Sequence, residues 1–133
     1  MTNTKKFYVG DLCYVLDSDT CDELFGLVAD SLLLEGESVT LQDGRKFFLG
    51  RTSHGDGNYF GSDGNNYSVD SGTIGIAAVE DISDENKFNH EYQGTLYWEQ
   101  LGHVHEMPSD SLEKSTSEFG YFKLGTIEIS TSN

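Results

Sequence analysis

Short apolar runs separated by polar turns make up most of the chain, and two pairs of these runs predict β-hairpins. In each pair the runs flank an Asp-Gly dipeptide, which is a strong short-range hairpin signal. Aspartate and glycine favour such turns because they accept the backbone angles that a tight reversal needs. The predicted hairpins pair residues 39–41 with 46–49 around Asp43-Gly44, and residues 58–60 with 66–69 around Asp63-Gly64.

Further runs rich in aromatic and β-branched residues predict additional strands. The first is expected to bend or bulge at Gly10, and Gly75 is expected to allow a close approach of two backbones. The polar segments 83–94 and 110–118 are predicted connections. The additional predicted strands are residues 7–16, 73–82, 95–101, 104–107, which Pro108 ends, and 120–130.

One segment has the periodicity of an amphipathic helix, and the sequence predicts that helix over residues 20–33. Asp19 or Thr20 can accept hydrogen bonds from the first backbone N–H groups, and Asp22 and Glu23 suit the positive end of the helix dipole. Gly26 inside the segment weakens its helix propensity. The apolar face is formed by Leu24, Leu27, Val28 and Leu32.

Together these elements predict a mainly β domain of the α+β class. The short connections favour antiparallel strands, arranged as a small barrel or a strongly twisted sheet with one packed amphipathic helix. A chain of 133 residues fits a single domain, 1–133, with enough aromatic material for one core. The polar segments 1–6 and 130–133 are expected to fray.

Charge is the strongest functional signal, because 23 acidic and 8 basic residues give a formal net charge of −15. Such a balance argues against direct binding to nucleic acid, whose phosphates would be repelled. It favours a basic protein partner, a cation, or imitation of a polyanion. The surface can also be acidic for solubility alone, without any partner.

The acidic residues are grouped along the chain, and the two groups are the predicted partner-binding residues. A solvated face without a specific role is the alternative interpretation. A mimic of DNA or RNA would need these carboxylates at phosphate-like spacings on a rigid scaffold. The groups are Asp17, Asp19, Asp22 and Glu23, and Glu80, Asp81, Asp84 and Glu85.

The segment 54–75 concentrates glycine, aspartate and asparagine, so it is a candidate cation site as well as a series of turns. Calcium takes six to eight oxygen ligands from such loops. The known calcium-loop pattern is not met, and turn formation alone explains the composition. The candidate ligands are Asp56, Asp63 and Asp70, with Asn58 and Asn65 as further oxygen donors.

Two other constellations are weaker. His103 and His105 alternate in a predicted strand, so both imidazoles face one side, and a zinc site would need His90, Glu99 or Cys13 as well. A small hydrolase would use Ser71 and Asp70, with Ser53-His54 nearby. The nucleophile-elbow pattern is absent, and an aspartic protease needs two such aspartates.

No apolar run approaches the roughly 20 residues of a membrane span, and a secretory signal is not evident. The expected location is therefore the cytoplasm, without membrane contact. Cys13 lies in an apolar run and is expected to be a buried, reduced thiol. A bridge to Cys21 stays possible, but it would suit an exported protein.

Three motifs resemble those of small acidic proteins found in bacteriophages and bacteria, most of which have no assigned function. The motifs are Tyr8-Val9-Gly10-Asp11-x-Cys13-Tyr14-Val15, Gly55-Asp56-Gly57-x-Tyr59 and Tyr67-x-Val69-Asp70-Ser71-Gly72-Thr73-Ile74-Gly75. The resemblance extends to Gly120, Phe122, Gly125 and Ile127 near the C-terminus. It implies a phage-encoded accessory protein that acts in the host cytoplasm, and it assigns no catalytic residue.

Charge and resemblance together predict a non-enzymatic acidic protein that engages a basic, nucleic-acid-binding host or defence protein as an inhibitor or DNA mimic. No cofactor is expected under this hypothesis. A calcium-dependent binding module at loop 54–75 and a small hydrolase at the same loop are the alternatives.

Overall fold

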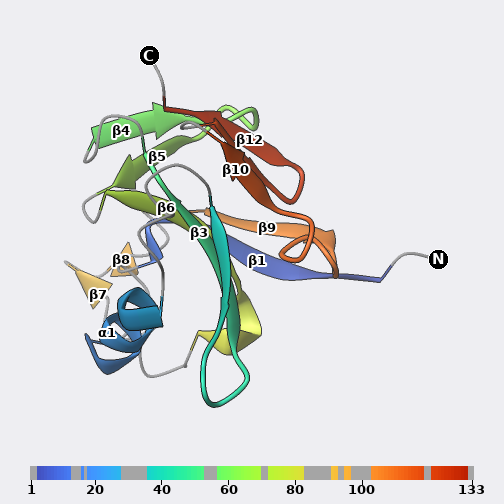
Figure 1. Ribbon diagram of the computed structural model, residues 1–133. Coiled ribbons are helices and arrows are strands. Elements are labelled where there is room, and N and C mark those ends of the chain that lie inside the picture. The colour runs from blue at the N-terminus through green and yellow to red at the C-terminus, as the bar shows by residue number, and fades with distance from the viewer. Residues whose placement is uncertain are drawn as a thin grey trace.

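The computed structural model describes most of the chain as two β layers and one helix (Figure 1). A five-stranded antiparallel sheet lies at the centre, in the order β2-β3-β6-β1-β9. Its strands are β1 (Thr4–Gly10), β2 (Glu37–Thr40), β3 (Lys46–Arg51), β6 (Thr73–Ala78) and β9 (His103–Pro108). The described residues are 3–12, 16, 18–27, 36–52, 57–69, 72–82, 91–92, 95–96, 103–118 and 121–131.

The second β layer consists of a three-stranded sheet and a hairpin. The sheet has the order β10-β11-β12, with β10 (Thr116–Glu118), β11 (Tyr121–Leu124) and β12 (Ile127–Ser130). The hairpin pairs β4 (Gly57–Phe60) with β5 (Asn66–Val69). A bridge between Gly61 and Ile129 joins the two units, and a separate short hairpin pairs β7 (Glu91–Tyr92) with β8 (Thr95–Leu96).

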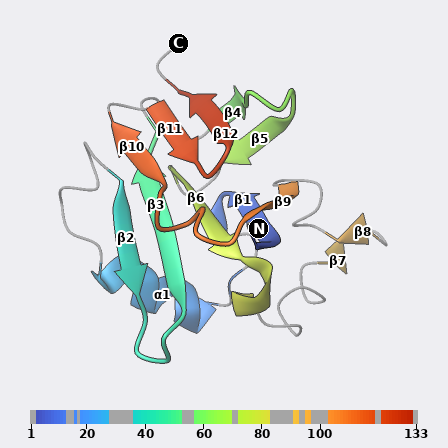
Figure 2. The ribbon, with the colours of Figure 1, turned by 90° about the vertical axis from the view of Figure 1, so that its right-hand side faces the viewer.

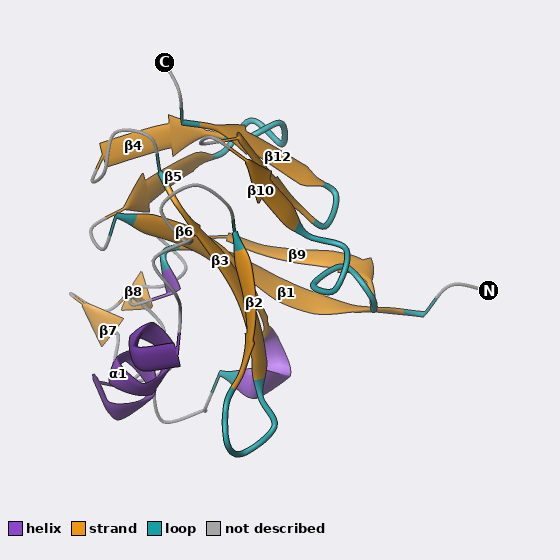
Figure 3. Cartoon of the chain, viewed as in Figure 1, coloured by secondary structure: helices purple, strands orange, loops and turns teal. Residues whose placement is uncertain are grey.

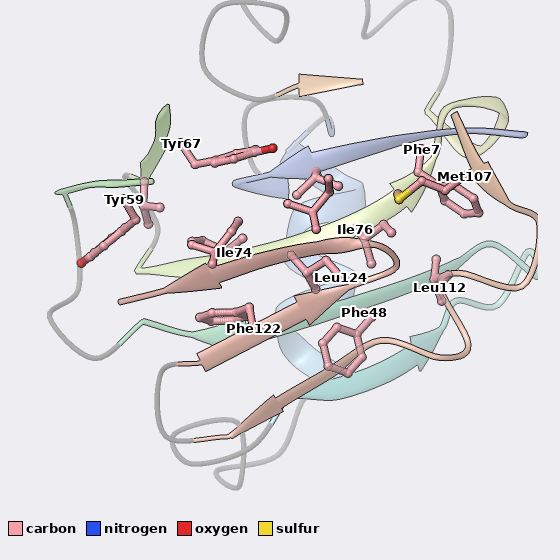
Figure 4. Close-up of a cluster of buried hydrophobic side chains, with 14 of the residues drawn as sticks. Phe7, Phe48, Tyr59, Tyr67, Ile74, Ile76, Met107, Leu112, Phe122 and Leu124 are labelled. Carbon is pink, nitrogen blue, oxygen red and sulfur yellow. The ribbon is translucent and has the colours of Figure 1, made fainter. Parts of the chain in front are cut away.

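The central strands are buried on both faces, and their alternating side chains supply two cores. One core fills the space between the two β layers (Figure 4). The other lies on the opposite face, where Leu24 of helix α1 (Ser18–Leu27) packs with Tyr8 and Phe47. In β1, for example, Phe7 and Val9 enter the first core while Tyr8 enters the second. The first core includes Phe7, Phe48, Tyr59, Tyr67, Ile74, Ile76, Met107, Leu112, Phe122 and Leu124.

Several predictions from the sequence are confirmed. The fold is mainly β, its sheets are antiparallel, and a helix packs on the central sheet, as expected. Both Asp-Gly hairpins form, and Gly44 and Gly64 have the positive φ angles that such turns require. Gly75 allows the expected close approach, because a Cβ atom there would collide with the backbone carbonyl of Phe48.

The barrel alternative is wrong. Among the described strands, β2 and β9 stand at the two edges of the central sheet, and the second layer lies across one face of that sheet without closing it (Figure 2). The architecture is therefore a pair of packed sheets with a helix on the outer side of the larger one. None of the helices in the described part of the chain is long and apolar enough to cross a membrane.

Two predicted strands end earlier than expected. The strand predicted over 7–16 ends at Gly10, and the Leu16 N–H then bonds to the Leu12 carbonyl across a turn. The strand predicted over 73–82 ends at Ala78 and continues as the 3-10 helix η3 (Val79–Asp81). Apolar composition alone does not separate these turns from the strands before them.

The C-terminal part differs most from its prediction. One strand was predicted over residues 120–130, but residues 121–130 form the hairpin β11–β12, since Gly125 has φ 63° and reverses the chain. Strands β7 and β10 lie in segments predicted as connections. Helix α1 begins at Ser18, two residues before the predicted start, and its predicted end near residue 33 lies outside the described residues.

Parts of both ends of the chain belong to strands of the described structure. Strand β1 begins at Thr4, and the Ser109 N–H bonds to the Asn3 carbonyl. Strand β12 extends to Ser130, and Thr131 is fully buried. Strand β1 pairs with both β6 and β9, so each of these neighbours satisfies backbone hydrogen-bonding groups of β1.

Candidate functional site

Parts of both predicted acidic groups lie together at one end of the central sheet. Arg45, in the turn between β2 and β3, connects them. Its Nη2 donates to Thr20 Oγ1 of α1 at 3.2 Å, and its Nη1 donates to the Asp81 carbonyl of η3 at 3.4 Å. Figure 3 shows α1 and η3 on either side of this hairpin.

We call this region the acidic end and define it by its described acidic residues. They come from three elements that are distant in sequence: helix α1, the β2–β3 turn and η3. Glu23 is tied to the turn, because its Oε2 accepts the Gln42 N–H at 3.0 Å. The members are Asp19, Asp22, Glu23, Asp43, Glu80 and Asp81.

Basic side chains neutralise only part of the acidic end. Arg45 Nε pairs with Asp43 Oδ2 at 2.7 Å, and Lys5 Nζ approaches Glu80 Oε1 at 3.6 Å. Within the described part of the chain, no salt bridge reaches Asp19, Asp22 or Glu23. These three carboxylates lie on an exposed or half-exposed surface.

Two carboxyls at the acidic end have shifted pKa values. The Arg45 backbone N–H, helped by its guanidinium, holds the pKa of Asp43 below its ordinary value. The pKa of Asp81 is raised, chiefly because the half-buried carboxyl loses hydration, although the Lys46 N–H bonds to it. Neighbouring Glu80 raises it further. The surroundings of Asp81 thus disfavour the charged form of its carboxyl group.

Three of the predicted partner-binding residues are not placed. Asp17, Asp84 and Glu85 lie outside the described residues, although each is close in sequence to a described member of the acidic end. Their contribution stays a prediction. The elements that carry the five described members of the predicted set meet at Arg45, and Asp43 lies in the turn between them, although the sequence analysis assigned it only to that turn.

The calcium prediction is only partly open to test. Asp63 is described, and its carboxylate is enclosed by protein donors: Oδ2 accepts from the Tyr67 hydroxyl at 2.6 Å and lies 2.9 Å from His105 Nε2. Asn65 adds its side-chain amide at 2.8 Å and its backbone N–H at 3.2 Å. We call Asp63, Asn65, Tyr67 and His105 the Asp63 cluster.

The other calcium candidates, Asp56 and Asp70, lie outside the described residues. Among the residues that are described, no group of three or more histidine, cysteine, aspartate or glutamate side chains could hold a metal ion. The oxygen ligands that Asp63 would supply are already used as hydrogen-bond acceptors within the fold. The calcium site stays a prediction that would depend on the other two aspartates.

The two strand histidines point to the same side, as predicted, and both contact β5. His103 Nε2 lies 2.9 Å from the Asn66 carbonyl, and the His103 ring meets the Tyr67 ring edge-on at 4.9 Å. His105 belongs to the Asp63 cluster. They therefore fasten the β4–β5 hairpin to β9. The further zinc ligands considered, His90, Glu99 and Cys13, lie outside the described residues, as do Ser53, His54, Asp70 and Ser71 of the hydrolase hypothesis.

The Asp63 cluster also shifts pKa values. Although burial opposes its charge, bonds from Tyr67 and Asn65 hold the pKa of Asp63 below its ordinary value. Burial, and then the neighbouring carboxylate, raises the pKa of Tyr67. Sequence analysis missed this cluster and the role of Arg45. The spacing of Asp63 and Tyr67 across a tight turn was a usable signal, whereas His105 is 38 residues from Tyr67.

Comparison of the chain with protein-family models, with curated proteins and with solved structures finds no match in any of the three.

Proposed function

We propose that the protein is a non-enzymatic binding protein whose acidic end engages a basic protein partner. The observation that carries the proposal is that Arg45 joins three elements that each bear acidic residues: it bonds to the Thr20 hydroxyl of α1, to the Asp43 carboxylate in the β2–β3 turn and to the Asp81 carbonyl of η3. Among the residues that the structure describes, no basic side chain forms a salt bridge with Asp19, Asp22 or Glu23. A negatively charged surface attracts a positively charged partner over several ångströms and raises the rate at which the two associate.

Rigid support favours binding over simple solvation. Helix α1 is anchored through Leu24, which is fully buried, and the β2–β3 turn is fixed by strand pairing as far as Thr40 and Lys46. The Arg45 guanidinium joins α1 to η3. Carboxylates held on such a scaffold lose little conformational freedom when a partner binds, which lowers the entropic cost of association.

The partner we propose is a protein that itself binds nucleic acid. Such proteins present lysine- and arginine-rich surfaces to phosphates, and carboxylates on a stiff support can occupy the same surface. The net charge of −15 would repel nucleic acid itself, so competition for its binding protein is the consistent mode of action. The resemblance to small phage proteins supports a role as an inhibitor of a host or defence protein.

Two variants with equal changes in net charge test the proposal. The first neutralises the acidic end with Asp19→Asn, Asp22→Asn, Glu23→Gln and Glu80→Gln. The control neutralises four exposed acids elsewhere, with Glu106→Gln, Asp110→Asn, Glu113→Gln and Glu118→Gln. Each variant is immobilised and exposed to nuclease-treated bacterial lysate at low salt.

We expect the unmodified chain and the control to retain basic nucleic-acid-binding proteins, and the acidic-end variant to lose them. Retention should fall as salt shortens the Debye length below about 8 Å. Added duplex DNA should release the retained protein, because the DNA and the acidic end compete for the same basic surface of that protein. The proposal fails if the two variants behave alike, or if retention ignores both salt and DNA.

A further inference from the structure

Arg45 is a basic residue within the acidic end, and most of its side chain is covered by the protein. It lies in the turn between β2 and β3, and only 23% of its side chain is exposed. A positive charge in a surface that binds a basic partner is ordinarily unfavourable for binding, because like charges repel. The contacts of Arg45 indicate the opposite effect.

Each guanidinium nitrogen of Arg45 donates to a different element. Nε donates to Asp43 Oδ2 in the turn at 2.7 Å, Nη2 to Thr20 Oγ1 of α1 at 3.2 Å, and Nη1 to the Asp81 carbonyl of η3 at 3.4 Å. Helix α1 and η3 are distant in sequence, so one side chain attaches both of them to the same turn. A planar guanidinium suits this role because its donors point in fixed directions, whereas a lysine ammonium is a single point of charge on a flexible stem.

The contacts of Arg45 with α1 and η3 are adjacent in sequence to acidic residues that face solvent. Thr20 lies between Asp19 and Asp22 in α1, and both aspartates are exposed. Asp81 directly follows Glu80 in η3, and Glu80 is exposed as well. Arg45 therefore fixes the backbone beside three carboxylates that a partner can reach.

Three other carboxylates of the acidic end accept backbone N–H groups in the turn or at the start of β3. Each of these bonds joins one acceptor to one donor: Glu23 to Gln42, Asp43 to Arg45, and Asp81 to Lys46. Helix α1 and η3 are thus each attached to the β2–β3 hairpin twice, once through a carboxylate and once through the Arg45 guanidinium. Removal of the guanidinium halves the attachments of both elements.

We propose that Arg45 is a positioning residue of the acidic end, and that by attaching α1 and η3 to the β2–β3 turn it strengthens the binding of a folded basic partner. This inference rests on the proposed function and names the residue that controls it. Carboxylates on a fixed backbone can match a folded basic surface without further ordering. Carboxylates on loosely attached elements must be ordered when the partner binds, and that ordering costs affinity.

Charge alone predicts the opposite sign. Loss of Arg45 makes the chain more negative by one charge, which raises the association rate and the affinity for a basic partner. A purely stabilising role for Arg45 is also distinguishable, because its loss would then lower the free energy of unfolding without weakening the binding of chains that remain folded. The direction of the change in affinity therefore separates positioning from both alternatives.

Three variants and two basic probes test the proposal. Arg45→Ala is compared with Arg51→Ala, which makes the same change in net charge at an exposed residue of the other end of β3. Arg45→Lys keeps the charge and removes the planar fork. The probes are a purified bacterial nucleoid protein of the HU type, which is folded and binds DNA, and a flexible synthetic peptide of alternating lysine and arginine. Calorimetry at low salt gives the affinities, and NMR spectra report whether each variant is folded.

We expect Arg45→Ala to bind the folded probe about threefold to tenfold more weakly than the original chain, and Arg45→Lys about threefold more weakly. Arg51→Ala should bind it at least as tightly as the original chain. The flexible peptide can follow carboxylates that move, so it should bind Arg45→Ala and Arg51→Ala alike. Hydrogen exchange of the Gln42 amide, which is bonded to Glu23 across the contact between α1 and the turn, should be faster in both Arg45 variants.

The inference is overturned if Arg45→Ala binds the folded probe as tightly as Arg51→Ala, if Arg45→Lys matches the original chain, or if exchange of the Gln42 amide is unchanged. The acidic-end variant with four neutralised residues distinguishes this failure from failure of the proposed function. If that variant loses binding and Arg45→Ala does not, only the inference about Arg45 fails. If the original chain binds neither probe, or binds them no better than the acidic-end variant, the proposed function fails and this inference fails with it.

Discussion

The acidic end and the Asp63 cluster use carboxylates in opposite ways. At the acidic end, Asp19 and Asp22 are exposed and have no salt-bridge partner in the described part of the chain. In the Asp63 cluster, the Asp63 carboxylate accepts hydrogen bonds from the Tyr67 hydroxyl and the Asn65 amide and lies next to His105. Only 12% of this side chain is exposed. The carboxylates of the first arrangement are accessible to a partner, whereas the carboxylate of the second forms hydrogen bonds within the fold.

The difference shows that the sequence around an aspartate in a turn does not tell whether its carboxylate has a structural role or is available to a partner. Both Asp43-Gly44 and Asp63-Gly64 are hairpin turns, and both aspartates bond to the residue two positions later. Asp63 differs from Asp43 in that it also contacts Tyr67 of its own hairpin and His105 of β9, a strand of the other sheet. Tertiary contacts therefore decide whether the carboxylate is structural or available.

The largest expected effect comes from removing the Asp63 carboxylate. Asp63→Ala removes the acceptor of the Asn65 amide and leaves the Tyr67 hydroxyl only His105 Nε2, at 3.1 Å, as a partner within the Asp63 cluster. We expect a loss of about 2–4 kcal/mol in the free energy of unfolding. Urea denaturation followed by circular dichroism measures it. Asp22→Ala, on the exposed surface of α1, is the matched control and should cost about 0.5 kcal/mol or less. Equal losses in the two variants would contradict the comparison.

Local sequence signals account for the parts of the fold in which turn chemistry is strong. Asp43-Gly44 and Asp63-Gly64 mark hairpins because their strands are adjacent in sequence and the turn sets the register. The Gly125 turn was missed, since the apolar alternation of residues 121–124 continues in 127–130 and hides the reversal. The 3-10 helix η3 was missed because Val79 continues an apolar strand.

The candidate sites depend more on contacts between distant segments. Grouping along the chain identified Asp19, Asp22 and Glu23 as one acidic group, and Glu80 with Asp81 as another. Their meeting depends on Arg45, which reaches both elements from a third. The bridge between Gly61 and Ile129 likewise joins the β4–β5 hairpin to β12, which is distant from it in sequence. Pairing between residues so far apart has no local signature.

A smaller and more selective effect is expected in the dependence of stability on pH, where Asp63 and Asp81 should differ in sign. The pKa of Asp63 is lowered by folding, so its contribution to stability is present above the ordinary aspartate value of 3.8 and is lost as the pH falls through the lower folded value. Asp63→Asn should therefore remove part of the acid-induced loss of stability. Urea denaturation between pH 3 and about pH 7 measures this change.

Asp81 should show the reverse behaviour because its pKa is raised by burial. Folding disfavours its charged form, so the penalty is present above the raised pKa and disappears as the pH falls toward 3.8. Asp81→Asn should stabilise the protein near neutral pH and have little effect in acid. If the free energy of unfolding changed with pH in the same way in Asp63→Asn and Asp81→Asn, the predicted difference in sign between the two carboxyls would be wrong.

The smallest expected effect is on stability when the exposed carboxylates are neutralised singly. Asp19→Asn and Asp22→Asn keep the shape of each side chain and remove charge that no salt bridge uses in the described part of the chain. Each should change the free energy of unfolding by less than about 0.5 kcal/mol, and any change should shrink as added salt screens the remaining repulsion. Thermal unfolding at low and high salt measures both quantities. A loss of more than about 1 kcal/mol in either variant would mean that its carboxylate is used within the fold, as that of Asp63 is, and is not available to a partner.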